Sequence, residues 1–208
     1  MESFKSSIFK NKALEALSGN WKPSVVVSLV AALVMGGTVA LQYASLWLYY
    51  IVFLVFGSIV SIGCLYVFLD LYRDKKIPQV ADLFTPFQQY GRIFACYIQV
   101  LIFTILWMLL FIIPGIIKGL SYSMSYFVLK DRPELSPAEA IKESQRLMKG
   151  HKADLFILQL SFIGWVILAA ITVIGLFWLL PYMNTAVAAF YEQLKNSDTE
   201  SLNNTAME

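Results

Sequence analysis

The chain contains apolar runs long enough to cross a membrane, and this feature constrains its fold more than any other. Between Ile93 and Leu129 the one charged residue is Lys118, whereas about 20 apolar residues in a helix already cross a hydrocarbon core. Hydrophobic residues make up 58% of the 208 residues, charged residues make up 14%, and the mean hydropathy is +0.65. These values are typical of integral membrane proteins. The sequence therefore predicts an all-α, polytopic transmembrane helical bundle.

Six membrane spans are expected within a single integral membrane domain, residues 1–195. Short links between successive spans favour three antiparallel hairpins, and short amphipathic helices are expected at the inner face. Residues 196–208 are polar and nearly free of hydrophobic side chains, so we expect a disordered tail. The expected spans cover about residues 24–41, 46–71, 93–113, 116–129, 155–172 and 176–194.

The number of spans depends on the sequence LLFIIPGIIKGLSYS inside the longest apolar run. Pro114 lacks a backbone donor and Gly115 tolerates positive φ, so the pair predicts a structural turn between two spans. A proline kink within one long helix is the alternative. One straight helix over residues 93–129 would be about 55 Å long, nearly twice the hydrocarbon thickness. The length favours the hairpin.

The distribution of basic residues gives an independent indication, because Lys and Arg are enriched on the cytoplasmic side of membrane proteins. With six spans, both termini and the charged segments between hairpins lie on one side. Fifteen of the sixteen Lys and Arg residues, and all fourteen Asp and Glu residues, then lie on that side or at its interface. Lys118 is the exception. The pattern predicts a multi-pass protein with both termini in the cytoplasm.

The segment SPAEAIKESQRLMKGHK predicts an amphipathic helix over residues 137–149 at the inner membrane surface. Ser136 and Glu139 form a capping box, Pro137 suits the first helical position, and Gly150 follows the helix. Its basic side chains indicate either a structural linker beside anionic headgroups or a docking surface for a partner or lipid. The candidate docking residues are Lys142, Arg146, Lys149 and His151.

Polar residues at membrane depth are functional candidates. Lys118, Tyr122 and Ser125 have i, i+4, i+7 spacing on the fourth span, and Asn184 lies in the sixth beyond Pro181. Together they are a candidate intramembrane polar stripe. The alternative for Lys118 is a snorkelling anchor near the outer surface.

Other motifs of catalysis or binding are absent from the sequence. There is no phosphate-binding loop, dinucleotide fingerprint, zinc motif or nucleophile elbow. Asp70 and Arg73, three residues apart, are expected to form a local salt bridge. We expect no enzyme activity, no cofactor, no metal site and no nucleic-acid partner.

The elements IPGI, AIxxS, MKGHK, FIGW and PY occur in this order. In this order they resemble the bacterial integral membrane family called domain of unknown function 975, and the resemblance extends to KALEALSGNW near the N-terminus. More distantly, the pattern is similar to membrane domains attached to bacterial glycerophosphodiester phosphodiesterases. The resemblance implies a helical membrane bundle in a bacterial cytoplasmic membrane, without a transferable activity.

These observations predict a non-catalytic membrane protein, an accessory or regulatory component that contacts a partner or lipids at the cytoplasmic face. The alternative is a small transporter or an export or immunity component for a lipid, peptide or drug. The expected partners are membrane lipids, with a cytoplasmic-face protein or a second copy of the chain as further candidates.

Overall fold

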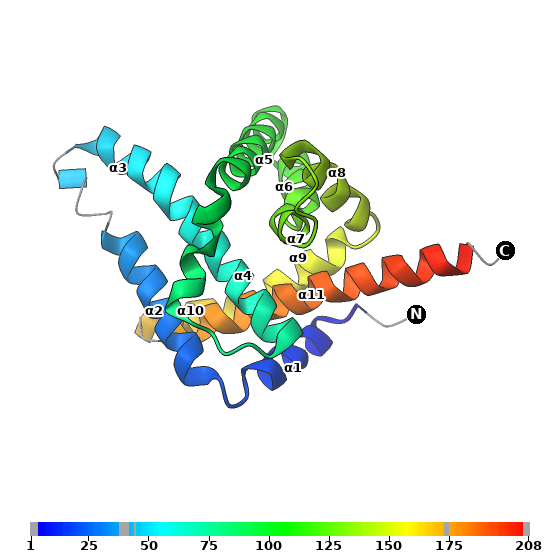
Figure 1. Ribbon diagram of the computed structural model, residues 1–208, viewed down its shortest axis with the longest axis horizontal. Coiled ribbons are helices and arrows are strands. Elements are labelled where there is room, and N and C mark those ends of the chain that lie inside the picture. The colour runs from blue at the N-terminus through cyan, green and yellow to red at the C-terminus, as the bar shows by residue number, and fades with distance from the viewer. Residues whose placement is uncertain (1–3, 38–41, 44, 173–174, 206–208) are drawn as a thin grey trace.

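The computed structural model describes residues 4–37, 42–43, 45–172 and 175–205, and these residues contain helices but no strand (Figure 1). The expected all-α class is confirmed. A short helix, α1 (Ser6–Leu17), ends before Gly19, whose φ of 80° suits glycine, and α2 (Trp21–Gly37) follows at an angle of 101°. Residues 38–41 of the expected first span lie outside the described residues.

A continuous helix follows from Leu46 to Asp74. It consists of α3 (Leu46–Val52), a π-helical turn η2 (Phe53–Gly57) and α4 (Ser58–Asp74). A 3-10 segment, η3 (Val80–Gln89), follows and leads directly into α5 (Tyr90–Leu110).

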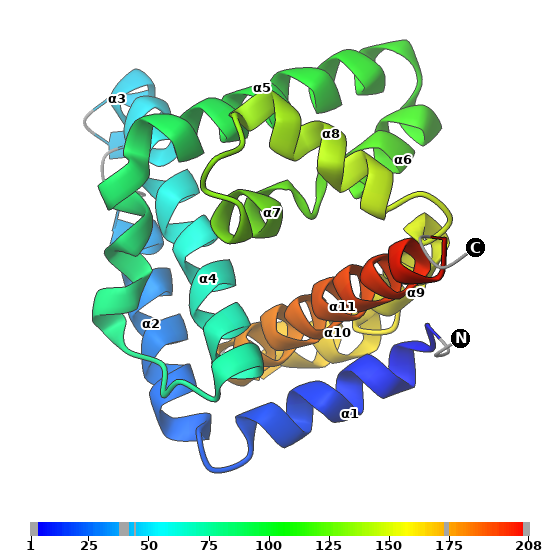
Figure 2. The same ribbon diagram turned by 45° about the vertical axis from the view of Figure 1, so that its right-hand side comes forward.

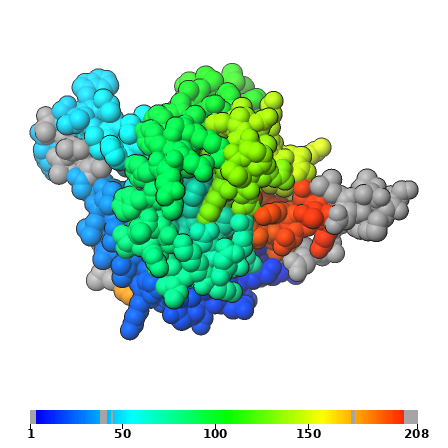
Figure 3. Space-filling model, in the orientation of Figure 1, coloured from blue at the N-terminus to red at the C-terminus, as the bar shows by residue number. Residues whose placement is uncertain are grey.

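Six helices follow in the described residues after Phe111. They are α6 (Ile112–Tyr122), α7 (Ser125–Asp131), α8 (Pro137–Leu147), α9 (Lys152–Leu160), α10 (Ile163–Thr172) and α11 (Gly175–Thr205). Figure 2 shows α5 reversing into α6, while α1 and α10 lie along α11. On the face shown in Figure 3, α5, α8 and η3 cover most of α11.

Four helices in the described residues are long and apolar enough to cross a membrane. They cover Leu46–Asp74, Val80–Leu110, Ile112–Asp131 and Lys152–Thr172, and the bent pair α1 and α2 would make a fifth. The sixth expected span lies within α11, where Pro181, Asn184 and Glu192 dilute the apolar sequence. A membrane protein of several apolar helices is supported, while the arrangement of six spans in three hairpins stays a prediction.

The turn between α5 and α6 is at Phe111, three residues before the expected Pro114. Phe111 has the extended angles φ −157° and ψ 137°, and it joins Leu110 to Ile112. Pro114 lies in the first turn of α6, where a helix does not need its N–H. Gly115 lies against the backbone of Met108, because a Cβ there would come within 2.9 Å of the Met108 Cα. The prediction that Pro114 and Gly115 form the turn is therefore wrong, and glycine instead permits close packing of α5 and α6.

The tail expected to be disordered from residue 196 is helical as far as Thr205, because α11 continues to that residue. The hydroxyls of Ser197 and Thr199 donate to backbone carbonyls one turn earlier, and Asp198 accepts two hydrogen bonds from Arg146 of α8. These hydrogen bonds, within α11 and between α11 and α8, stabilise the polar end of the helix. Residues 206–208 lie outside the described part.

The core surrounds the middle of α11, where Ala186, Ala188 and Ala189 are fully buried. Small side chains let neighbouring helices approach closely, and α1 and α4 both pack on α11. Phe9 of α1 contacts Phe190 of α11 at a ring distance of 5.0 Å. The N-terminal helix is thus part of the core.

We predict that Gly63→Ala destabilises the protein, because the added Cβ would lie 2.1 Å from the carbonyl oxygen of Leu83 in η3. Overpacking of this kind typically costs about 2 kcal/mol. The free energy of unfolding can be measured by circular dichroism in mixed detergent micelles containing increasing SDS. Gly164→Ala is the control, since no atom lies within 4 Å of its added Cβ and alanine favours a helix by up to about 1 kcal/mol. Equal stability of both variants would contradict close packing of α4 on η3.

Candidate functional site

A polar network joins three helices around the carboxylate of Asp131 at the end of α7. Its side chain is 6% exposed, and Arg73 of α4 donates one hydrogen bond of 2.8 Å to each carboxylate oxygen. From α11, the hydroxyl of Tyr191 donates over 3.0 Å and Lys195 donates over 2.7 Å. Arg73 also donates through Nε to Glu192 over 2.9 Å. Two cations and two carboxylates therefore balance each other at one end of the helices.

The expected local salt bridge between Asp70 and Arg73 is wrong. Asp70 instead pairs with Lys130 of α7, which also donates to the carbonyl of Tyr66 over 3.0 Å. Arg73 uses its planar guanidinium for the bidentate contact with Asp131, a stronger arrangement than a single exposed pair on one helix. The two ion pairs tie α4 to α7.

Arg92 of α5 binds backbone carbonyls at and beyond the end of α7. Its guanidinium donates to the backbone carbonyls of Leu129, Arg132 and Leu135 over 2.8 to 3.1 Å. The last carbonyls of a helix lack partners within the helix, so Arg92 satisfies them from α5. The sequence analysis did not identify this contact, since its partners lie about forty residues away.

The capping box of α8 is confirmed. Ser136 accepts from the N–H of Glu139, and the Glu139 side chain accepts from the N–H of Ser136 over 2.8 Å. The apolar face, with Ala140, Ile141 and Met148 buried, packs on α5, α6 and α7, and the location of α8 at the inner membrane surface stays a prediction. Burial of this apolar face holds α8 against α5, α6 and α7.

Ser144 fixes α8 against the break between α6 and α7. Its fully buried hydroxyl donates to the carbonyl of Ser121 over 2.8 Å and accepts from the N–H of Met124 over 3.2 Å. One side chain thus satisfies two backbone groups that the interrupted helix leaves without partners. Helical spacing places Ser144 on the same face as Ala140 and Ile141, but it does not identify the hydrogen-bond partners of Ser144.

The four candidate docking residues differ in their surroundings. Arg146 forms a bidentate pair with Asp198 of α11 and also donates to Glu143. The Nδ1 atom of His151 lies 3.1 Å from the carboxylate of Asp154, and the imidazole ring lies 4.1 Å from the ring of Phe4. Lys142 and Lys149 are exposed, and neither forms an ion pair within the residues that the structure describes. Two of the four are therefore available to another molecule.

Arg146 also changes the acidity of its two partners. Its hydrogen bonds stabilise the charged carboxylates and hold the pKa of Glu143 and the pKa of Asp198 below their usual values. The same contacts raise the pKa of Arg146. The tie between α8 and α11 is therefore charged at neutral pH.

The candidate intramembrane stripe does not form one surface. Lys118 lies over the ring of Trp107 of α5 at 4.9 Å, and the ring of the buried Tyr122 lies 6.2 Å from Phe103. The helix breaks before Ser125, whose buried hydroxyl has no hydrogen-bond partner in the described residues. Asn184 lies partly buried on α11. The break at residues 123–124 interrupts the helix between Tyr122 and Ser125.

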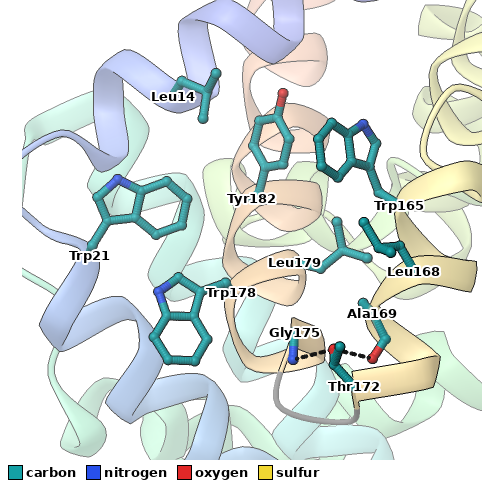
Figure 4. Close-up of a pocket in the computed structure, with 10 residues that line it drawn as sticks. All are labelled: Leu14, Trp21, Trp165, Leu168, Ala169, Thr172, Gly175, Trp178, Leu179 and Tyr182. Atoms are coloured by element: carbon teal, nitrogen blue, oxygen red, sulfur yellow. Dashed lines mark hydrogen bonds between the residues drawn. The ribbon is translucent and has the colours of Figure 1, made fainter.

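An apolar groove of about 550 Å³ lies between α1, α2, α10 and α11. Figure 4 shows three tryptophans around it, Trp21, Trp165 and Trp178, with Leu168, Leu179 and Tyr182 between them. Sequence reasoning missed this groove, because each residue separately fits a lipid-facing or interfacial position. The signal that could have found it is the concentration of three of the five tryptophans in helices that fold onto each other.

Comparison with known proteins gives one match. The family model described as protein of unknown function (DUF975) matches residues 98–198, from within α5 to α11. The match supports the resemblance to this family over that part of the chain, which is shorter than the resemblance implied. No curated protein and no solved structure matches the chain.

We predict that Asp131→Asn lowers the free energy of unfolding by about 2 kcal/mol, because it removes the buried carboxylate to which the partly exposed Arg73 and Lys195 donate charged hydrogen bonds. The same detergent unfolding measurement applies. The control is Asp74→Asn, since Asp74 is exposed and forms no ion pair within the described residues. In a double-mutant cycle, Lys195→Met should cost less in the Asp131→Asn background than alone. Additive costs would contradict a shared network.

Proposed function

We propose that the whole chain belongs to this family of unknown function and is a multi-pass protein of the bacterial cytoplasmic membrane. In this proposal six spans form three hairpins, and both termini lie in the cytoplasm. The four long apolar helices support it, as does the gathering of Arg73, Asp131, Glu192 and Lys195 at one end of the helices. Under the positive-inside rule this end is cytoplasmic.

Within this topology we assign the protein a non-catalytic role, as an accessory or regulatory component that binds a protein partner through α8. One observation carries the assignment. The buried face and Ser144 hold α8 in place, while Lys142 and Lys149 point outward without ion-pair partners in the described residues. A helix held in place, with Lys142 on it and Lys149 two residues beyond its end, suits a partner with an acidic surface.

Distant kinship with membrane domains attached to glycerophosphodiester phosphodiesterases is part of this proposal at the level of fold. It brings no catalytic residue to this chain, because the kinship concerns the membrane domain and not the phosphodiesterase domain.

The second candidate function is a small transporter or an export or immunity component for an apolar molecule. The specific observation that favours it is the tryptophan-lined groove between α2, α10 and α11. Lys118 and Tyr122 support it less, since both contact aromatic residues of α5. Flux of an apolar substrate by the reconstituted protein alone would favour this function over the accessory role.

Cysteine labelling tests the topology. After Cys64→Ala and Cys96→Ala, a membrane-impermeant maleimide added to intact cells should label Phe111→Cys and should not label Glu134→Cys. Both positions are exposed, and position 111 avoids the close contact that Gly115 makes. Both should be labelled in opened membranes, which controls for reactivity. Labelling of position 134 in intact cells would overturn the six-span arrangement.

Photocrosslinking tests the partner. A photoreactive residue in place of Gln145 of α8 should give one protein adduct in cells, and that protein should co-purify in a fixed ratio. Lys142→Glu with Lys149→Glu should reduce the adduct at least tenfold, because the charge is reversed. Lys5→Glu with Lys75→Glu is the charge-matched control and should leave it unchanged. An adduct that contains only lipid, or only a second copy of this chain, would contradict the accessory role.

A further inference from the structure

A polar pocket of about 370 Å³ lies where the end of α4 meets α1 and α11. Figure 2 shows α1 along α11, with the end of α4 beside both helices. The volume of the pocket is within the range of small-molecule sites. All eight residues that line it have a polar side chain, and five of them are charged. The pocket therefore suits a polar ligand that carries charge.

Two of the charged lining residues neutralise each other. Arg73 donates through Nε to the carboxylate of Glu192 over 2.9 Å, and it also holds Asp131 from both ends of its guanidinium fork. These residues already belong to the network that joins α4, α7 and α11. The charges that remain for a ligand are those of Lys12, Lys75 and Glu15.

Lys75 and Glu15 are opposite charges that line one pocket without meeting. Lys75 directly follows α4, and Glu15 lies near the end of α1. Both side chains are exposed, and neither forms an ion pair with the other or with any further residue in the described ranges. A ligand that carries a negative group and a positive group can bridge them.

Lys12 adds a second positive charge to the same pocket. Its ammonium donates to Oε1 of Gln193 over 3.2 Å, and Gln193 is 5% exposed, so a buried side chain of α11 holds the lysine in position. Two lysines together favour a phosphate, while the carboxylate of Glu15 favours an ammonium group through charge-assisted hydrogen bonds. The lining therefore suits a phosphate and an ammonium joined by a short linker.

We propose that this pocket binds a phosphoethanolamine group, with the phosphate at Lys12 and Lys75 and the ammonium at Glu15. The group occurs as the headgroup of phosphatidylethanolamine and in soluble phosphoethanolamine esters. In the proposed six-span topology the end of α4 lies at the cytoplasmic side, so the pocket is level with the headgroups of the inner leaflet. The lipid as source rests on that topology, whereas binding of the soluble group does not.

Native mass spectrometry of the full chain in detergent tests the lipid. From an equal mixture of phosphatidylethanolamine and phosphatidylcholine, the protein should retain about tenfold more of the first, because the trimethylated amine cannot donate a charged hydrogen bond to Glu15. Calorimetric titration with glycerophosphoethanolamine and glycerophosphocholine tests the soluble group. A preference between the lipids alone assigns the site to a headgroup, and a preference between the soluble pair assigns it to a free ester. No preference in either pair would overturn the site.

Two variants separate the ammonium from the phosphate, each measured with the pair of compounds that shows the preference. Glu15→Gln should remove the preference for ethanolamine over choline and should leave binding of the matching glycerol compound unchanged, since that compound has a phosphate and no ammonium. Lys75→Gln should weaken both. Glu134→Gln and Lys22→Gln are the controls, because both residues are exposed, form no ion pair within the described residues and do not line the pocket.

Each assignment has an outcome that contradicts it. A preference for ethanolamine that survives Glu15→Gln would overturn the ammonium assignment. Equal effects of Lys75→Gln and Lys22→Gln would overturn the phosphate assignment.

Failure of this proposal is distinguishable from failure of the proposed function. Loss of the ethanolamine preference would leave the cysteine labelling and the adduct from α8 unaffected. Labelling of position 134 in intact cells would contradict the placement of the pocket at the inner leaflet and would leave the test with the soluble pair unaffected.

Discussion

The carboxylate of Asp131 constrains the packing of three helices, because a charge removed from water needs charged or polar partners. Its partners come from α4 and α11, and the side chain of Asp131 is 6% exposed. Once Arg73, Tyr191 and Lys195 converge on it, the ends of α4, α7 and α11 are fixed relative to one another. Arg92 then binds the carbonyls after α7 from α5, so a fourth helix joins the same end.

The apolar faces of the amphipathic segments α1 and α8 complete the core. The buried residues of α1 pack on α11, and those of α8 pack on α5, α6 and α7. Burial of these faces leaves the exposed apolar side chains mainly on α3, α5, α6, α9 and α10. Exposed apolar surface of this extent is a mark of contact with lipid or another protein.

The proposed partner surface depends on the fixed position of α8. Lys142 of α8 and Lys149, two residues beyond its end, are exposed, and Ser144 fixes the position of α8.

The sequence by itself determined the features that depend on neighbours within one or two turns. Helical class, the capping box at Ser136, the glycine after α1 and the buried face of α8 all follow from local spacing and backbone preference. Only the tertiary structure decided that the turn is at Phe111, that Arg73 pairs with Asp131, and that three tryptophans line one groove. The physical reason is distance along the chain: Arg73 and Asp131 are 58 residues apart, and helix periodicity carries no information about which faces meet. Packing brings such residues together, and the cost of burying unpaired charge selects the partners.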